Sequence, residues 1–128
     1  MPPSPILAVK DLHAHYGRAH ILQGVSLEAN AGEVVALLGR NGAGKSTTLK
    51  AIMGLLPPSK GEVAFAGARV ERLPPYRIAR LGLGYVPEER RIFSDLSVME
   101  NLEVGRQAAR DSAPAWTPDR LFGLFPNL

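Results

Sequence analysis

The sequence predicts an α/β fold with an antiparallel β portion at its N-terminus, and three consecutive segments carry the α/β part of this prediction. Residues 33–38, Glu-Val-Val-Ala-Leu-Leu, form an apolar run that is typical of a buried strand. Residues 39–47 follow with the pattern G-x-x-x-x-G-K-[ST]. Apolar residues then recur at i, i+3, i+4 and i+7 over residues 49–56, as on one face of a helix. Strand, glycine loop and helix are the context in which this pattern binds phosphate groups.

Each residue type in the loop suits contact with a triphosphate. Glycine lets backbone N–H groups approach the phosphates, Lys45 brings a positive charge to the β and γ oxygens, and the Ser46 hydroxyl can ligate Mg²⁺. The following helix points its positive end at the bound anion. The alternative is a coincidental turn, which the flanking patterns argue against. We expect these residues to contact the nucleotide: Gly39, Arg40, Asn41, Gly42, Ala43, Gly44, Lys45, Ser46 and Thr47.

The residues before the loop predict two strands and a connecting turn. Residues 6–12 and 21–28 have strand-like patterns, and Tyr16-Gly17-Arg18 between them is typical of a turn. Residues 30–32, Asn-Ala-Gly, predict a second turn that leads into the apolar run. After the loop, we expect the helix that starts near Lys45 to end around Gly54, because two prolines follow shortly beyond.

The remaining elements are expected to be short, and each is bounded by glycine, proline or a helix cap. They are a strand at 62–65 with a turn at Gly67, a helix at 77–81, a strand at 84–86, a helix from the capping box Ser97–Glu100 to about Arg110, and a helix that begins at Thr117-Pro118-Asp119.

Composition excludes several classes of protein. The 128 residues amount to one domain, and the absence of cysteine excludes disulfides and thiolate metal sites. No apolar run of about 18 residues is present, so we expect no transmembrane segment. The formal net charge of +3 is too small to indicate nucleic-acid binding. Residues 1–5 lack the pattern of a signal peptide and are expected to form a flexible tail.

Taken in order, these motifs resemble the ATP-binding subunit of an ABC transporter. The resemblance rests on an early aromatic residue, a Gly-Glu-Val strand before the loop, the loop itself, Gly-Glu-Val at 61–63 and Tyr-Val-Pro-Glu at 85–88. Residues 86–93 and 96–102 are most similar to the second ATPase of branched-chain amino acid importers. The likeness extends from Leu7 to Leu128.

The resemblance implies a phosphate-loop NTPase fold of ABC type, with ATP and Mg²⁺ as cofactors. It implies an ATPase that couples ATP binding and hydrolysis to uptake of branched-chain amino acids; an importer of urea or short amides stays open as an alternative. The implied partners are a sister ATPase subunit, membrane permease subunits and, through them, a periplasmic binding protein. The implied location is the cytoplasmic face of the cell membrane.

The family pattern has parts that residues 1–128 lack: the signature sequence, the strand ending in Asp-Glu (Walker B) and the switch histidine. The resemblance therefore implies a partial nucleotide-binding domain, truncated before those segments, and we expect no hydrolytic activity from this chain alone. A non-hydrolysing nucleotide-binding fragment is the alternative. A GTPase is disfavoured, because neither Asp-x-x-Gly nor Asn-Lys-x-Asp occurs; a small-molecule kinase is disfavoured by the 38 residues that precede the loop.

Two residues outside the loop match functional positions of the family. Tyr16 matches the aromatic residue that stacks on adenine; otherwise it is a packing or turn residue. Glu88 stands where most family members have a glutamine that contacts Mg²⁺ and the attacking water; otherwise it is a loop acid. The resemblance thus gives Lys45 and Glu88 catalytic roles, and Ser46 and Glu88 the role of Mg²⁺ ligands.

Other side chains favour structural roles over chemical ones. His13, His15 and His20 suggest a metal site, but no cysteine or acid cluster supports one, and surface or paired histidines are favoured. Arg90 and Arg91 are interpreted as a solvated basic pair, with contact to a membrane subunit as the alternative. Trp116 is interpreted as a packing anchor.

Overall fold

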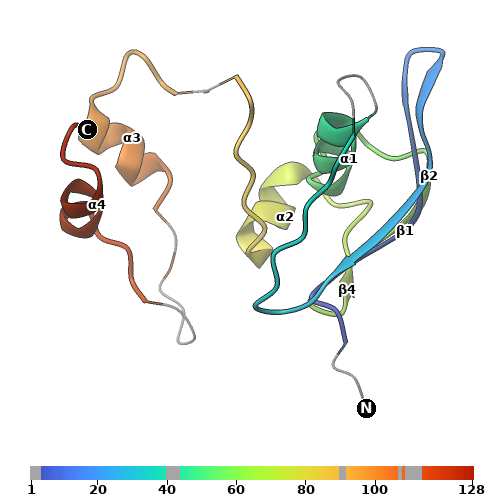
Figure 1. Cartoon of the computed structure of the whole chain (residues 1–128). Helices are drawn as coiled ribbons and strands as arrows, with labels where there is room; N and C mark the ends of the chain where they lie inside the picture. Colours follow the sequence, from blue (N-terminus) through green and yellow to red (C-terminus); the bar gives the residue numbers. More distant parts are fainter. Residues whose placement is uncertain (1–3, 40–43, 90–91, 107, 109–113) are drawn as a thin grey trace. The chain divides into compact units, whose positions relative to one another are not determined.

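The computed structural model describes residues 4–39, 44–89, 92–106, 108 and 114–128 (Figure 1). The chain divides into two compact units, Met1–Tyr85 and Val86–Leu128. Predictions made for Arg40, Asn41, Gly42, Ala43, Arg90 and Arg91, and for most of the N-terminal tail, lie outside the described residues.

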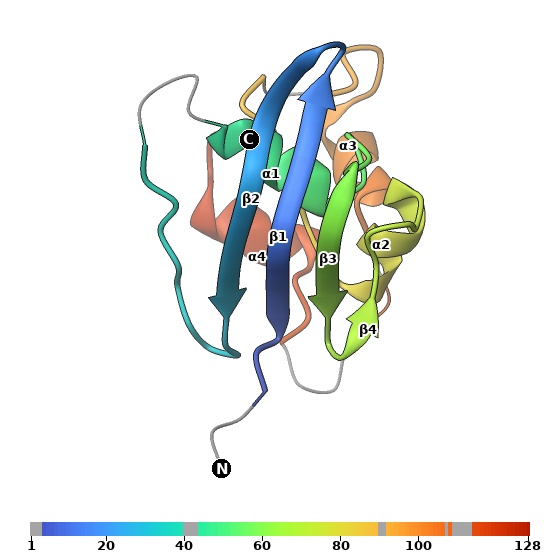
Figure 2. The ribbon, with the colours of Figure 1, turned by 90° about the vertical axis from the view of Figure 1, so that its right-hand side faces the viewer.

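The first unit contains a four-stranded antiparallel sheet in the order β2-β1-β3-β4 (Figure 2). Its strands are β1 (Leu7–Tyr16), β2 (Ala19–Ala29), β3 (Lys60–Phe65) and β4 (Ala68–Arg69). Strands β1 and β2 form a hairpin in which Tyr16 pairs with Ala19. The predicted antiparallel β portion and its first turn are therefore confirmed.

A bulge at Asp11 interrupts the pairing of β1 with both of its neighbours. Asp11 has a positive φ of 49°, and its backbone N–H donates to Ser26 Oγ at 2.9 Å. A Cβ at Gly61 of β3 would lie 2.4 Å from the Asp11 carbonyl oxygen, and one at Gly24 of β2 would lie 2.8 Å from its Oδ1. The bulge therefore requires a glycine on each flanking strand.

One face of the sheet packs against helices α1 (Lys45–Ile52) and α2 (Pro75–Leu81) around a small apolar core. Figure 2 shows α1 crossing behind β1 and β2. The core consists of Val9, Leu12, Ala14, Leu22, Ala51, Ile52, Met53, Val63, Val70 and Ile78.

The predicted buried face of the first helix is confirmed at Ile52 and Met53, which are buried, and at Leu56, which packs against the core. Leu49 is 45% exposed, whereas Thr47, Thr48, Ala51 and Ile52 are buried.

The apolar run at 33–38 does not form the predicted strand. Its backbone pairs with no strand among the described residues, and Val34 and Leu38 are 97% and 88% exposed. An extended segment becomes a strand only beside another strand, and a buried parallel strand also needs cover on both faces. The strand predicted at 84–86 is likewise absent from the structure.

The second unit contains α3 (Val98–Val104) and α4 (Pro118–Leu124). The predicted capping box is present: Glu100 N–H donates to Ser97 Oγ at 3.1 Å, and Ser97 N–H donates to Glu100 Oε1 at 3.0 Å. Thr117 caps α4 as predicted. Helix α3 ends earlier than the predicted Arg110, at Val104, because Gly105 follows and glycine is a poor helix former.

Trp116 is not the packing anchor that the sequence suggested. Its ring is 57% exposed, and the Arg120 guanidinium carbon lies 4.4 Å from the ring centre. The arginine also donates to the Ala115 carbonyl oxygen at 2.8 Å. The pair is a cation–π contact at the start of α4.

Candidate nucleotide-binding site

Gly44 joins the phosphate loop to α1 in a conformation that favours glycine. It is buried, its φ is 94°, and a Cβ at this position would lie 3.0 Å from Leu22 Cδ2. Its carbonyl oxygen accepts two hydrogen bonds from Thr48, one from the backbone N–H at 2.8 Å and one from Oγ1 at 2.7 Å. The end of the loop is therefore fixed on the sheet and on the first turn of the helix.

Lys45 connects the two described ends of the loop. Its Nζ donates a hydrogen bond to the carbonyl oxygen of Gly39. The ammonium group thus lies against the backbone of the loop. Its side chain belongs to the first residue of α1. This arrangement keeps a positive charge at the mouth of the loop, where the sequence predicts phosphate binding.

The next two residues face opposite surroundings. Ser46 is exposed in the first turn of α1, so its hydroxyl is open to a ligand. Thr47 is buried on the side of the helix that packs against the sheet. The backbone N–H groups of the first helical turn have no acceptor within the helix, which leaves them for an anion.

Tyr16 lies at the end of β1 with 46% of its surface exposed. Two residues earlier on β1, Ala14 pairs with Leu22, whose side chain lies beside Gly44. The hairpin that carries Tyr16 therefore contacts the end of the phosphate loop. An exposed ring on this hairpin is compatible with base stacking, and the role of Tyr16 stays a prediction.

Glu88 belongs to the second unit, whereas the phosphate loop belongs to the first. It is exposed in a turn that follows Pro87. Its assignment as a Mg²⁺ ligand and catalytic residue therefore rests on the sequence alone and stays a prediction.

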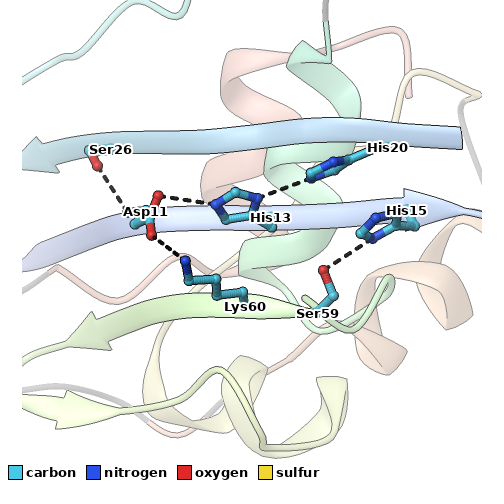
Figure 3. Close-up of polar contacts among 7 residues, drawn as sticks. All are labelled: Asp11, His13, His15, His20, Ser26, Ser59 and Lys60. Atoms are coloured by element: carbon cyan, nitrogen blue, oxygen red, sulfur yellow. Dashed lines mark hydrogen bonds and ion pairs between the residues drawn. The ribbon is translucent and has the colours of Figure 1, made fainter.

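The three histidines interact with one another and with Asp11 on the face of the sheet opposite α1 (Figure 3). His13 Nδ1 lies 3.0 Å from His20 Nε2, and the rings of His15 and His20 stack with their centres 4.2 Å apart. No group of three His, Cys, Asp or Glu side chains is arranged to hold a metal ion in the part of the chain that the structure describes. The histidines form hydrogen-bonded and stacked pairs instead.

Sequence reasoning missed several polar residues that order the structure. Asn101 bonds through its side chain to both the N–H and the carbonyl of Phe93, and to the carbonyls of Leu96 and Ser97. Glu71 accepts from Arg69 and from the backbone N–H of Val63. Neither Asn101 nor Glu71 belongs to a periodic pattern from which its role could be predicted, because the partners of each side chain are set by loop conformation.

Comparison with known proteins gives a consistent result. Residues 22–121 match the protein family described as ABC transporter. The chain is 37% identical over 123 residues to the high-affinity branched-chain amino acid transport ATP-binding protein BraG of Pseudomonas aeruginosa, covering 96% of this chain and 53% of that protein. It is 39% identical over 114 residues to the lipopolysaccharide export system ATP-binding protein LptB of Escherichia coli K12, covering 89% of this chain and 47% of that protein.

Solved structures agree with this match. One described as the ATP binding subunit of an ABC transporter is 38% identical with a TM-score of 0.69, and the match covers 77% of this chain and 40% of that one. A nucleotide-free ATP-binding cassette is 27% identical with a TM-score of 0.68, over 94% of this chain and 46% of that one. The chain thus spans about half the length of the curated relatives it matches.

Proposed function

Because the chain belongs to the ABC transporter family of ATP-binding proteins, we propose that it binds Mg–ATP through its phosphate loop as part of an ATP-binding subunit of an importer. The observation that carries this proposal is the junction at Gly44 and Lys45. There a positive-φ glycine, a lysine ammonium group and the start of α1 meet at one point.

The side chains present fit both implied cofactors. The Lys45 ammonium and the N–H groups at the start of α1 suit phosphate oxygens, and the Ser46 hydroxyl is a hard oxygen ligand of the kind that Mg²⁺ prefers. When bound, Mg²⁺ neutralises phosphate charge. On nucleotide binding, Lys45 would exchange the Gly39 carbonyl for phosphate oxygens, a stronger, charge-assisted interaction. Tyr16 would stack on the base, and the proposed role of Glu88 as a Mg²⁺ ligand rests on the sequence resemblance alone.

The proposed cargo is a branched-chain amino acid. Support comes from the name of the Pseudomonas aeruginosa relative and from the resemblance of residues 86–93 and 96–102 to such importers. Lipopolysaccharide export is a second candidate, because the Escherichia coli relative is similarly identical. The proposed partners are permease subunits at the cytoplasmic face of the membrane, a sister ATPase and a periplasmic binding protein.

Co-purification would separate the two candidate cargoes. The tagged chain is expressed with the membrane subunits of a branched-chain amino acid importer or with those of a lipopolysaccharide exporter. Retention of the importer subunits alone is the expected result, and retention of the exporter subunits alone would reverse the assignment.

Catalysis is proposed for the complete subunit and not for residues 1–128 alone. Val34 and Leu38 are exposed in an extended segment that pairs with no strand among the described residues. Among the described residues, none of the helices could form a membrane span. We expect the purified chain to turn over ATP at the background rate. Phosphate release that stops on replacement of Lys45 would contradict this expectation.

Nucleotide binding itself can be tested with a fluorescent ATP analogue. The purified chain should bind the analogue with Mg²⁺, and the affinity should fall when EDTA removes the metal, because Ser46 then has no cation to share with the phosphates. Absence of saturable binding in Mg²⁺ would refute the proposed function.

A further inference from the structure

A chain of polar contacts crosses the outer face of the sheet beside the β1–β2 turn (Figure 3). Asp11 Oδ1 lies 3.1 Å from His13 Nε2, and His13 Nδ1 lies 3.0 Å from His20 Nε2. Because the first of these residues lies at the bulge of β1 and the last lies at the start of β2, the chain ties the two strands together close to their turn.

The number of protons on this chain is limited by its geometry. An ionised Asp11 can only accept, so His13 Nε2 must carry the proton that it donates. The His13–His20 contact then needs one hydrogen between two nitrogens, which both the neutral pair and the pair with one extra proton provide. If both rings become imidazolium, two N–H groups face each other across 3.0 Å, and the bond is replaced by repulsion.

The surrounding charges keep the acceptor in place. The hydrogen bond from His13, reinforced by the Lys60 ammonium group 3.5 Å from Oδ2, lowers the pKa of Asp11 below its ordinary value. His15 Nδ1 is hydrogen-bonded to Ser59 Oγ at 3.1 Å, and the ring of His15 stacks on the ring of His20. Among the other ionisable groups, Tyr16 ends β1 and Arg18 is exposed in the adjoining turn, whereas Lys10, Glu28 and Glu62 lie further from the turn and α1 lies on the opposite face.

The histidines lie next to the residues that the proposed function assigns to the nucleotide. His15 pairs with His20, and the following pair is Tyr16 with Ala19. Beyond His20, Leu22 contacts Gly44 at the end of the phosphate loop. A change in the pairing of His20 therefore acts on the strand segment that connects Tyr16 with the loop.

We infer that His20 and His13 are positioning residues of the nucleotide site: their shared hydrogen bond holds the hairpin in the form that binds ATP, and protonation of both rings releases it. This inference rests on the proposed nucleotide binding. It makes ATP affinity fall when a second proton on the His13–His20 pair replaces their shared hydrogen bond by repulsion.

The test measures ATP affinity of the wild type and of His20→Gln between pH 8 and pH 5.5. Glutamine can donate from its amide to His13 Nδ1 but does not titrate. Between pH 8 and pH 5.5, the ATP affinity of the wild type should fall about 2- to 10-fold more than that of His20→Gln. This difference is the range expected for one hydrogen bond. Because a terminal phosphate also titrates near pH 6, only the difference between the two proteins counts.

Two further variants complete the test. Glu28→Gln, on the same face but outside the cluster, should follow the wild-type pH profile. His20→Ala should bind ATP more weakly than His20→Gln at pH 8. Parallel pH profiles for wild type and His20→Gln would overturn the inference while leaving nucleotide binding intact. Absence of ATP binding at pH 8 would instead refute the proposed function, and the inference with it.

Discussion

The Nζ of Lys45 donates a hydrogen bond to the carbonyl oxygen of Gly39, so the lysine near the end of the phosphate loop is bonded to the residue at its start. The bond holds the ammonium group near the start of α1. A bound phosphate offers this group a charged acceptor, which is worth roughly twice a neutral one. The contact is therefore one that nucleotide binding would replace.

Replacement of Gly44 by alanine should destabilise the first unit and weaken nucleotide binding. The new Cβ would sit at a φ of 94° and 3.0 Å from Leu22 Cδ2. We expect a loss of about 1–3 kcal/mol in the free energy of unfolding, measured by urea denaturation. Gly105→Ala is the matched control, because Gly105 has a φ of −84° and room for a methyl group. Equal stability of the two variants would show that the conformation at Gly44 is unimportant.

Replacement of Tyr16 by alanine should weaken ATP and GTP binding alike. Stacking depends on a flat ring and tolerates any base, and its loss costs about 1–3 kcal/mol. Tyr16→Phe should retain affinity, and Tyr76→Ala, which removes an exposed ring from α2, should leave it unchanged. If Tyr16→Ala loses thermal stability but binds normally, the residue packs the hairpin turn and does not contact the base.

Local features of the fold were predictable from sequence, and features that depend on distant contacts were not. The β1–β2 turn and the caps at Ser97 and Thr117 involve residues close in sequence, and each was found as predicted. The strand at 33–38 was predicted wrongly because an apolar run says nothing of whether a neighbouring strand is present to pair with it. Periodicity correctly predicted that Ile52 and Met53 are buried, but not that Leu49 is exposed.

The candidate site shows the same division. The phosphate-loop pattern located Gly44, Lys45 and Ser46 at the start of a helix before the structure was known. The contact network of the histidines could not be predicted, because the bulge at Asp11 shifts the pairing of β1 and brings the carboxylate to His13. The close approach of Gly61 to Asp11 gives no signal in the sequence beyond a glycine.

Acid should destabilise the first unit through Glu71. Burial opposes ionisation of this side chain, but hydrogen bonds from Arg69 and from the Val63 N–H outweigh it and lower the pKa of Glu71 below its ordinary value. A lowered folded-state pKa contributes stability above the unfolded-state value, and this contribution is lost as the pH falls through the folded-state value. The free energy of unfolding, measured from pH 7 to pH 3, should therefore decrease in this range.

Glu71→Gln should be less stable than the wild type at pH 7, by about 1–3 kcal/mol, and should lose less stability in acid. Glu62→Gln is its control, since Glu62 pairs with Arg69 at 3.4 Å with half of its side chain exposed. If the free energy of unfolding depends on pH in the same way for the wild type and for Glu71→Gln, the sensitivity to acid comes from other groups, such as Asp11 and Glu100.

The central claim, that the phosphate loop binds Mg–ATP, is tested most directly by calorimetric titration of the wild type, Lys45→Ala and Lys50→Ala. Lys50 lies in the last turn of the same helix, so its replacement removes an equal charge away from the loop. Loss of one charge-assisted contact should weaken ATP binding of Lys45→Ala by roughly 10- to 150-fold, with Lys50→Ala close to the wild type. Unchanged ATP affinity in Lys45→Ala would contradict the account.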